Sequence, residues 1–265
     1  MRNILIIGCG LLGSSLLRRI QKKKMANKIY IYEKSKLNIT KIKKLKLPGI
    51  IVKKLEDGVV NADLIILCTP MSEYKNLILK INEYLSPKTI ITDIGSSKIE
   101  SSKIIKKYLK KDIFWTQSHP IAGSEVSGPE HGKQDIFENK WCVLIKEKNT
   151  KKNHLTKLNK FWKKIGSKVV IMNAEKHDKI FSITSHLPHL IAYNLVKSAQ
   201  DFEKIQNYDL IKYSAGGLRD FSRIAASNEI MWRDIFFNNK QNISKAIDLF
   251  IKNLISFKKD INSKN

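Results

Sequence analysis

Residues 8–13, Gly-Cys-Gly-Leu-Leu-Gly, follow an apolar run at residues 4–7 and begin a helical pattern. Their G-x-G-x-x-G spacing gives the three glycines separate tasks: a tight turn, a close approach of backbone to pyrophosphate, and close packing of helix on strand. Backbone N–H groups and the helix dipole then favour a phosphate at the helix N-terminus. The strand–turn–helix context predicts a dinucleotide cradle, although a glycine-rich turn can also be purely structural. The predicted contacts come from Gly8, Gly10, Leu11, Leu12 and Gly13.

An acidic residue, Glu33, stands about twenty residues after this turn, at the end of the second apolar run. A carboxylate there accepts hydrogen bonds from the ribose 2′-hydroxyl and repels a 2′-phosphate, so it favours NAD over NADP. The neighbouring Lys34 and Lys36 weaken this preference, because either ammonium could bind a phosphate. We therefore predict NAD as the cofactor, with NADP less favoured.

Further cofactor contacts are predicted from the places where strands end. Ligands of open α/β sheets lie at the carboxyl ends of the strands. Thr69 and Pro70 follow one apolar run, and we expect them along the ribose side of the cofactor. Ser96 follows the next run, and we expect it near the nicotinamide.

The order of strand and helix patterns predicts the fold class. Short β-branched runs alternate with helical patterns in the first part of the chain, which predicts an α/β domain with a doubly wound parallel sheet over residues 1–172. Apolar spacings of three and four predict an all-helical domain over residues 173–265. The predicted strands are 3–7, 28–32, 64–68, 89–92, 113–117, 141–145 and 168–172. The predicted helices are 11–24, 71–84, 97–109, 151–165, 174–200, 201–213 and 228–261.

Composition restricts the function classes. The chain has 265 residues and a formal net charge of +25, because 43 lysines and six arginines outnumber 24 acidic residues. The lysines are spread along the whole length, so AT-rich codon usage explains their number better than a nucleic-acid-binding surface does. The basic field of the protein would attract anionic substrates. The cysteines Cys9, Cys68 and Cys142 form no C-x-x-C pair, so neither a disulfide scaffold nor a metal site is predicted. The first apolar run is too short for a signal peptide or a membrane span, and we expect a cytoplasmic protein.

The stretch at residues 118–130, Ser-His-Pro-Ile-Ala-Gly-Ser-Glu-Val-Ser-Gly-Pro-Glu, is typical of a reactive loop. His119 comes directly after the predicted strand 113–117, so we expect it at the same carboxyl edge as Ser96. A histidine there can take up a proton during hydride transfer, but it could also merely cap the loop. Glu125 could orient groups at the site or simply face solvent.

Two further clusters carry candidate binding residues. His186 and His189 are one helical turn apart, but two ligands are too few to hold a metal. Either a substrate-facing role or a role in the core fits these two histidines. Arginine is rare in this lysine-rich chain, and Arg219, Arg223 and Arg233 lie close together in sequence. A planar guanidinium can bind a carboxylate in a bidentate manner, and we expect this role for Arg223. The alternative for these arginines is a salt bridge within the protein, and we favour that role for Arg233.

Four motifs occur in order along the chain: His-Pro-Ile-Ala-Gly-Ser-Glu at 119–125 followed by Ser-Gly at 127–128, Ser-His-Leu-Pro-His at 185–189, Gly-Gly-Leu-Arg-Asp-Phe at 216–221, and Met-Trp-Arg-Asp at 231–234. Together they resemble the prephenate dehydrogenase family, which includes arogenate and cyclohexadienyl dehydrogenases. The resemblance extends from about residue 3 to residue 255 and implies a Rossmann domain, a helical dimerisation domain and an active site between them.

The resemblance also implies roles for individual residues. His119 matches the catalytic histidine that takes the hydrogen bond from the ring hydroxyl of the substrate, and Ser96 the serine that bridges that hydroxyl and the nicotinamide. His189 matches a substrate-binding histidine, and Arg223 an arginine that holds a substrate carboxylate. Glu125 matches an acid near the site entrance. Arg219, where some relatives carry lysine, is the remaining substrate-binding candidate.

The implied reaction is the NAD-dependent oxidative decarboxylation of prephenate to 4-hydroxyphenylpyruvate in tyrosine biosynthesis. The alternative is an arogenate dehydrogenase or a dual-specificity cyclohexadienyl dehydrogenase. The resemblance further implies a homodimer formed mainly through the C-terminal helices. We expect neither a metal, a membrane nor a nucleic acid among its partners.

Overall fold

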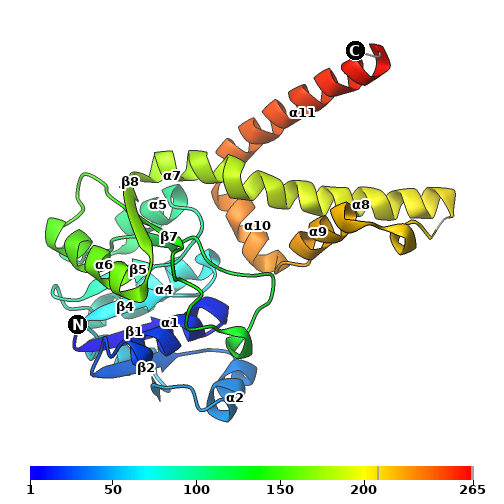
Figure 1. Ribbon diagram of the computed structural model, residues 1–265. Coiled ribbons are helices and arrows are strands. Elements are labelled where there is room, and N and C mark those ends of the chain that lie inside the picture. Colours follow the sequence, from blue (N-terminus) through cyan, green and yellow to red (C-terminus); the bar gives the residue numbers. More distant parts are fainter. Residues whose placement is uncertain (208, 264–265) are drawn as a thin grey trace. The chain divides into compact units, whose positions relative to one another are not determined.

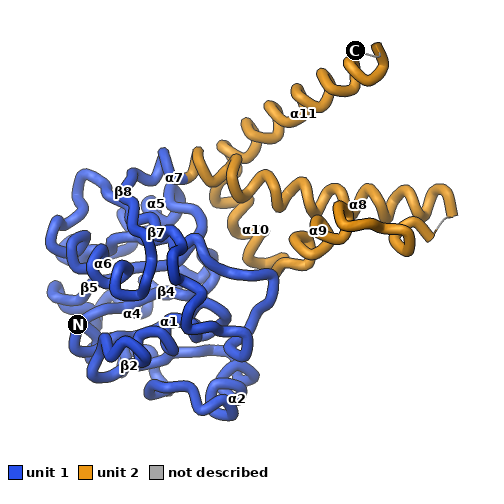
Figure 2. Tube along the Cα trace, viewed as in Figure 1, with its two compact units in different colours: residues 1–177 blue, residues 178–265 orange. Residues whose placement is uncertain are grey.

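The computed structural model describes residues 1–207 and 209–263 (Figure 1). The contacts between residues divide the chain into two compact units, residues 1–177 and residues 178–265 (Figure 2). The domain boundary predicted after residue 172 is a few residues before this division and stays a prediction.

Unit 1 is built on a parallel sheet of five strands in the order β3-β2-β1-β4-β5. The order reverses between β1 and β4, which is the switch point where ligands bind in doubly wound folds. The predicted doubly wound parallel sheet is therefore confirmed. The two-residue strand β3 was not predicted, because so short a run has no periodicity. The strands are β1 (Asn3–Ile7), β2 (Lys28–Tyr32), β3 (Ile50–Ile51), β4 (Leu64–Leu67) and β5 (Ile90–Asp93).

Helices connect these strands, as expected for crossover connections, and their apolar faces pack on the sheet (Figure 1). The predicted helix 71–84 consists of one α-helix flanked by two 3-10 turns. The helices are α1 (Leu11–Lys22), α2 (Lys36–Lys44), α3 (Leu55–Val60), η1 (Met71–Glu73), α4 (Tyr74–Ile81), η2 (Asn82–Tyr84), α5 (Ile99–Tyr108), η3 (Pro129–His131) and α6 (Lys152–Ile165).

A second, three-stranded sheet in unit 1 corrects one prediction. Its strands are β6 (Ser118–Pro120), β7 (Trp141–Ile145) and β8 (Lys168–Met172), with β6 antiparallel to β7 and β8 parallel to it. The predicted strand at 113–117 is wrong, since only Trp115 forms a bridge with the main sheet. The segment is shared between the sheets: Thr116 N donates to Ile91 O, and Ile145 N donates to Gln117 O. His119 consequently lies inside a strand of the second sheet rather than in a loop after a strand of the main one.

Helix α7 (Ala174–Phe181) crosses the division between the units, and the rest of unit 2 is helical, as predicted. Helix α9 was not predicted; it begins at two consecutive glycines, 216 and 217, which have low helix propensity. Helix α9 runs alongside α8 (Figure 1). None of the helices within residues 1–207 and 209–263 has the length and apolar character that crossing a bilayer requires. The elements of unit 2 are η4 (Ser182–His186, a π-helical turn), α8 (Leu187–Gln206), η5 (Leu210–Tyr213), α9 (Gly216–Ala225), α10 (Glu229–Asn238) and α11 (Lys240–Ser263).

Candidate active site

The glycine turn between β1 and α1 has the geometry of a phosphate cradle. Gly8 has a φ of +88°, and a Cβ there would lie 2.9 Å from the backbone of Cys68. A Cβ on Gly13 would lie 2.1 Å from the carbonyl oxygen of Gly8, so the helix can approach the strand only with glycine. A Cβ on Gly10 would meet no heavy atom of the described residues within 4 Å. The open space at Gly10 is therefore where a phosphate can approach the backbone.

The carboxylate of Glu33 is fixed against this turn. One of its oxygens accepts a hydrogen bond from Cys9 N at 2.8 Å, and the other accepts one from Ser35 N at 2.9 Å. Burial, together with the nearby Glu33 carboxylate, raises the pKa of the Cys9 thiol to about 12, so Cys9 is a neutral thiol. Lys34 forms a salt bridge with Glu73 at 2.5 Å, which directs its ammonium toward that carboxylate.

The hydroxyl of Thr69 is a buried polar group without a hydrogen-bond partner among the described residues. Thr69 follows β4, and its methyl group lies 3.0 Å from the position of a Cβ on Gly8. Buried hydroxyls are nearly always satisfied, so an orphaned one beside the glycine turn indicates a place for a ligand. Pro70, the next residue, caps the 3-10 turn η1.

A buried polar network lies at the end of β5. The carboxylate of Asp93 accepts hydrogen bonds from Lys98 Nζ at 2.6 Å, Trp115 Nε1 at 3.1 Å, the Tyr74 hydroxyl at 3.2 Å and Gly95 N at 3.0 Å. The side chains of Asp93 and Lys98 are both 0% exposed. Burial and the Asp93 carboxylate raise the pKa of Tyr74 well above its usual value, so its hydroxyl remains a donor.

Lys98 connects this network to the strand that carries His119. Its ammonium also donates to the carbonyl oxygen of Ser118 at 2.8 Å. The hydroxyl of Ser118 in turn donates to the carbonyl oxygen of Asp93 at 2.6 Å. Ser96, which is half-buried, sits in the turn between Asp93 and Lys98, so both ends of that turn are anchored to β6.

His119 is 8% exposed, and its ring is paired with a second histidine. Nδ1 of His119 lies 2.8 Å from Nε2 of His177, which is fully buried in α7. The two ring centroids are 5.0 Å apart. Glu125 lies in the loop between β6 and η3 and is half-buried. The buried position of His119 excludes the alternative of a histidine that only caps an exposed loop.

In unit 2, His189 stacks on Trp232 with ring centroids 3.6 Å apart and an interplanar angle of 21°. Its Nδ1–H donates to the carbonyl oxygen of Ser185 at 2.9 Å. In the neutral ring, Nε2 is then a hydrogen-bond acceptor. Burial lowers the pKa of His189, so the ring is neutral at neutral pH. His186 is buried in the same unit, within 3.1 Å of the Asn239 amide, which favours a core role.

The arginines of unit 2 divide into two kinds. Arg219 and Arg223 lie one turn apart on α9, and both side chains are exposed. Arg233, on α10, forms a salt bridge with the adjacent Asp234 at 2.9 Å, as expected for a structural role. Arg219 and Arg223 therefore present guanidinium groups at the surface of their own unit.

Two family models match this chain. Residues 16–171 match the nucleotide-binding domain of prephenate dehydrogenase, and residues 173–265 match its dimerization domain. The chain belongs to the prephenate dehydrogenase family. The predicted family, enzyme class and dinucleotide-binding domain are thereby confirmed.

Relatives in the family match along nearly the whole chain. The cyclohexadienyl dehydrogenase of Zymomonas mobilis is 33% identical over 253 residues, which cover 96% of this chain and 86% of that protein. The prephenate dehydrogenase of Lactococcus lactis is 33% identical over 259 residues, covering 96% and 70%. The crystal structure of Aquifex aeolicus prephenate dehydrogenase with hydroxyphenyl propionate and NAD+ is 34% identical, with a TM-score of 0.92 over 100% of this chain and 92% of that chain. The names of these relatives cover more than one substrate specificity.

Of the predicted site residues, the glycines, Glu33 and Thr69 lie at the glycine turn, and Ser96 and His119 lie beside the buried network. The predicted residues His189, Arg219 and Arg223 lie in unit 2. The sequence motifs did not point to His177 or to the role of the Asp93–Lys98 pair.

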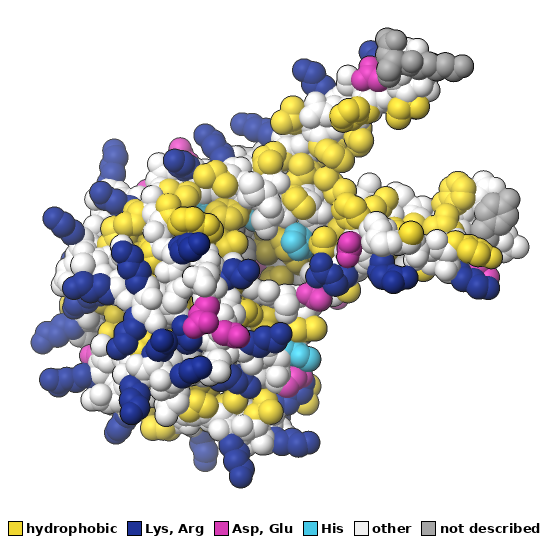
Figure 3. Space-filling model, viewed as in Figure 1, with side chains coloured by type: hydrophobic (Ala, Val, Ile, Leu, Met, Phe, Trp, Pro, Cys, Tyr) yellow, Lys and Arg dark blue, Asp and Glu magenta, His cyan; other side chains and the backbone are white. Residues whose placement is uncertain are grey.

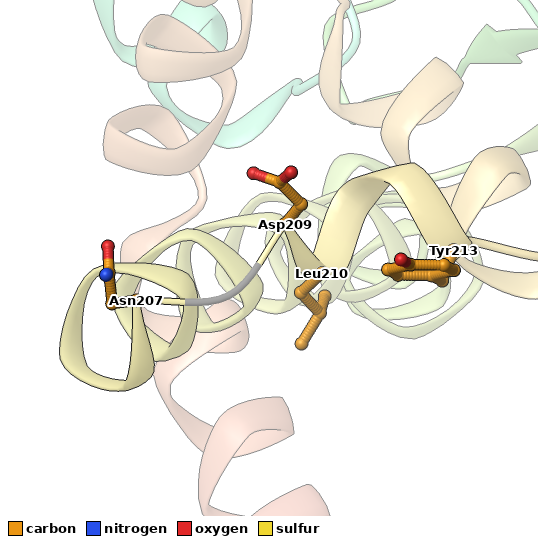
Figure 4. A pocket seen from close by; sticks show the side chains of 4 residues that line it. All are labelled: Asn207, Asp209, Leu210 and Tyr213. Atoms are coloured by element: carbon orange, nitrogen blue, oxygen red, sulfur yellow. The ribbon is translucent and has the colours of Figure 1, made fainter.

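A surface hollow of about 500 Å³ in unit 2 is lined by Asn207, Asp209, Leu210 and Tyr213 (Figure 4). None of these four lining residues is a predicted site residue.

Proposed function

We propose that this enzyme catalyses the NAD-dependent oxidative decarboxylation of prephenate to 4-hydroxyphenylpyruvate, a step of tyrosine biosynthesis. The observation that carries the proposal is the buried imidazole of His119, hydrogen-bonded at Nδ1, in the unit that contains the dinucleotide cradle. A positioned base and a bound hydride acceptor are what oxidation of a ring alcohol requires.

The residues around the glycine turn fit NAD. With NAD bound, the open space at Gly10 would accommodate the pyrophosphate, the fixed Glu33 carboxylate would accept hydrogen bonds from the ribose, and the orphaned Thr69 hydroxyl would gain a partner. Leu11 and Leu12 lie at the start of α1, where backbone N–H groups meet phosphate. When bound, NAD supplies the acceptor for the hydride.

In the proposed reaction, His119 takes the proton from the ring hydroxyl of prephenate as hydride leaves the same ring carbon. Loss of carbon dioxide then makes the ring aromatic as a phenolate, and the phenolate oxygen takes the proton back from His119 to give 4-hydroxyphenylpyruvate. We assign to Ser96 the orientation of that hydroxyl, and the anchoring of its turn to β6 supports this role. We assign the substrate carboxylates to Arg223, assisted by Arg219, and a further substrate contact to His189.

We assign to Glu125 a role at the entrance to the site. Its place in the loop after β6 supports a role near the entrance to the site. The carboxylate would then act on substrate entry rather than on the reacting atoms. A Glu125→Gln variant should accordingly change kcat/KM more than it changes the rate of a single turnover.

A second candidate, dual specificity for prephenate and arogenate, is supported by the 33% identity to a cyclohexadienyl dehydrogenase over 96% of this chain. Parallel assays of NADH formation with each substrate, and with NAD and NADP, discriminate the candidates. Turnover of prephenate alone supports the main proposal, and turnover of both substrates supports the second. If NAD is reduced neither with prephenate nor with arogenate, both candidate functions are refuted.

We also propose that the protein is a homodimer formed through unit 2. Helix α11 exposes a series of large apolar side chains (Figure 3). An exposed apolar stripe of this length needs a partner, and the matching family model is a dimerization domain. Sedimentation analysis should give twice the mass of the chain, and a monomer at micromolar concentration would contradict the proposal. The exposed residues of α11 are Leu249, Ile251, Leu254, Ile255, Phe257 and Ile261.

We place the enzyme in the cytoplasm. The support is that Cys9, Cys68 and Cys142 are all free thiols, as is usual in a reducing compartment.

A further inference from the structure

We propose that His177 is a positioning residue for His119: it accepts a hydrogen bond from Nδ1–H of His119 and thereby keeps Nε2 of His119 as the proton acceptor. The inference rests on the proposed function of His119. The distance of 2.8 Å between the two ring nitrogens is that of a strong hydrogen bond, and both rings are buried.

A hydrogen bond between two imidazoles requires one proton between the two nitrogens. If His119 Nδ1 carries that proton, then Nε2 of neutral His119 has a lone pair, and His177 carries its own proton on Nδ1. In the opposite arrangement, His119 would hold its proton on Nε2 and could not accept another there. The nitrogen that is protonated in a neutral histidine is set by the bond that the other nitrogen makes. Only the first arrangement allows His119 to act as the base.

The pair also supports the charged state of His119. When Nε2 takes up the substrate proton, the Nδ1–H of the imidazolium donates to a neutral ring, and the hydrogen bond becomes charge-assisted. His177 therefore stabilises the product of proton transfer more than the starting state. An interaction that strengthens along the reaction raises turnover rather than substrate affinity.

The N-terminal end of α7, which carries His177, is held in place by Asn173 and Glu147. Asn173 caps the start of α7, since its Oδ1 accepts from Lys176 N at 2.8 Å and its carbonyl oxygen accepts from His177 N at 3.1 Å. The carboxylate of Glu147, from the segment after β7, accepts from Ala174 N at 3.0 Å. The strand β7 also pairs with β6, so the second sheet fixes both members of the histidine pair. Such fixed geometry is what a positioned base needs.

The test uses two variants at the position and one matched control. In His177→Leu the hydrogen-bond acceptor is lost, whereas the side-chain amide oxygen of His177→Gln can still accept from His119. His154→Leu is the control, because His154 is a buried histidine of the same unit whose Nδ1 has no partner among the described residues. Steady-state kinetics with prephenate and NAD should show kcat lowered about 10- to 100-fold in His177→Leu. The KM for NAD should stay unchanged, His177→Gln should recover part of the loss, and His154→Leu should retain the wild-type kcat.

The ¹⁵N NMR spectrum of histidine-labelled protein reports the tautomer of His119 without any turnover, and its signals are assigned by their loss in a His119→Asn variant. The wild type should show a protonated Nδ1 and a bare Nε2 on His119, and His177→Leu should show protonation moving to Nε2. A wild-type spectrum with a bare Nδ1, or an unchanged kcat in His177→Leu, would overturn the proposal. If neither cyclohexadiene substrate is oxidised, the function proposed above fails, while the spectrum still decides whether His177 sets the tautomer.

Discussion

Replacing Lys98 by Met should destabilise unit 1, because the buried carboxylate of Asp93 would lose its counter-ion. The Lys98 ammonium is the counter-ion of Asp93, and both side chains are completely buried. Removing one partner of a buried ion pair costs about 3–5 kcal/mol, because the other charge is left uncompensated. Asp93 retains hydrogen bonds from Trp115, Tyr74 and Gly95, so we expect the lower end, a loss of about 3 kcal/mol in the free energy of unfolding. Urea unfolding followed by circular dichroism measures it.

Two further variants make the expectation specific. Lys103→Met removes a lysine of α5 that is 66% exposed and paired with Glu100, and its effect should stay within about 0.5 kcal/mol. The double variant Asp93→Asn/Lys98→Met removes both charges and keeps a polar group for the Trp115 and Tyr74 donors, so it should be more stable than Lys98→Met alone. If Lys98→Met unfolds at the same urea concentration as the wild type, or if the double variant is less stable than Lys98→Met, the buried-charge explanation is refuted.

Three other outcomes test the cradle and the proposed roles. Gly13→Ala should lower the melting temperature, because its Cβ would lie 2.1 Å from the Gly8 carbonyl oxygen. Gly10→Ala should have the melting temperature of the wild type but bind NAD more weakly in calorimetry. Equal melting temperatures for the two variants would contradict this prediction. His119→Asn should lower kcat about 10²- to 10⁴-fold in steady-state assays, and near-normal turnover would remove His119 from the mechanism. Arg223→Lys should raise the KM for prephenate without changing NAD affinity, since an ammonium cannot bind a carboxylate bidentately; an unaltered KM would reassign Arg223 to structure.

The parts of the fold that the sequence predicted well are those with a local signal. The strands β1, β2, β7 and β8 have the predicted bounds, because each is an apolar run bounded by polar residues or turns. The strand β6 could not be found in this way. Its three residues, Ser118 to Pro120, have no alternation of their own, and their strand geometry comes from pairing with β7, a long-range contact. Tertiary pairing, not local preference, decided this region.

The same division applies to the candidate site. The glycine turn, Glu33 and His119 each carry a local motif, so the sequence could single them out. His177 carries no motif, and its importance comes from a partner that lies 58 residues earlier in the chain. The Asp93–Lys98 pair had a weak signal, two opposite charges that flank a turn at the end of a buried strand, but charges in a lysine-rich chain are usually solvated.

Lys98 also explains how a short strand can hold His119, the histidine that we propose as the base. It binds the Asp93 carboxylate at the end of β5 and the Ser118 carbonyl at the start of β6, so the turn with Ser96 and the strand with His119 share one anchor. A three-residue edge strand held by sheet pairing alone would have few contacts to resist displacement. Because proton transfer depends on sub-ångström placement, loss of this anchor should reduce turnover even in molecules that remain folded. With His119 as the proposed base, the buried ion pair would contribute to the placement of that base as well as to the stability of unit 1.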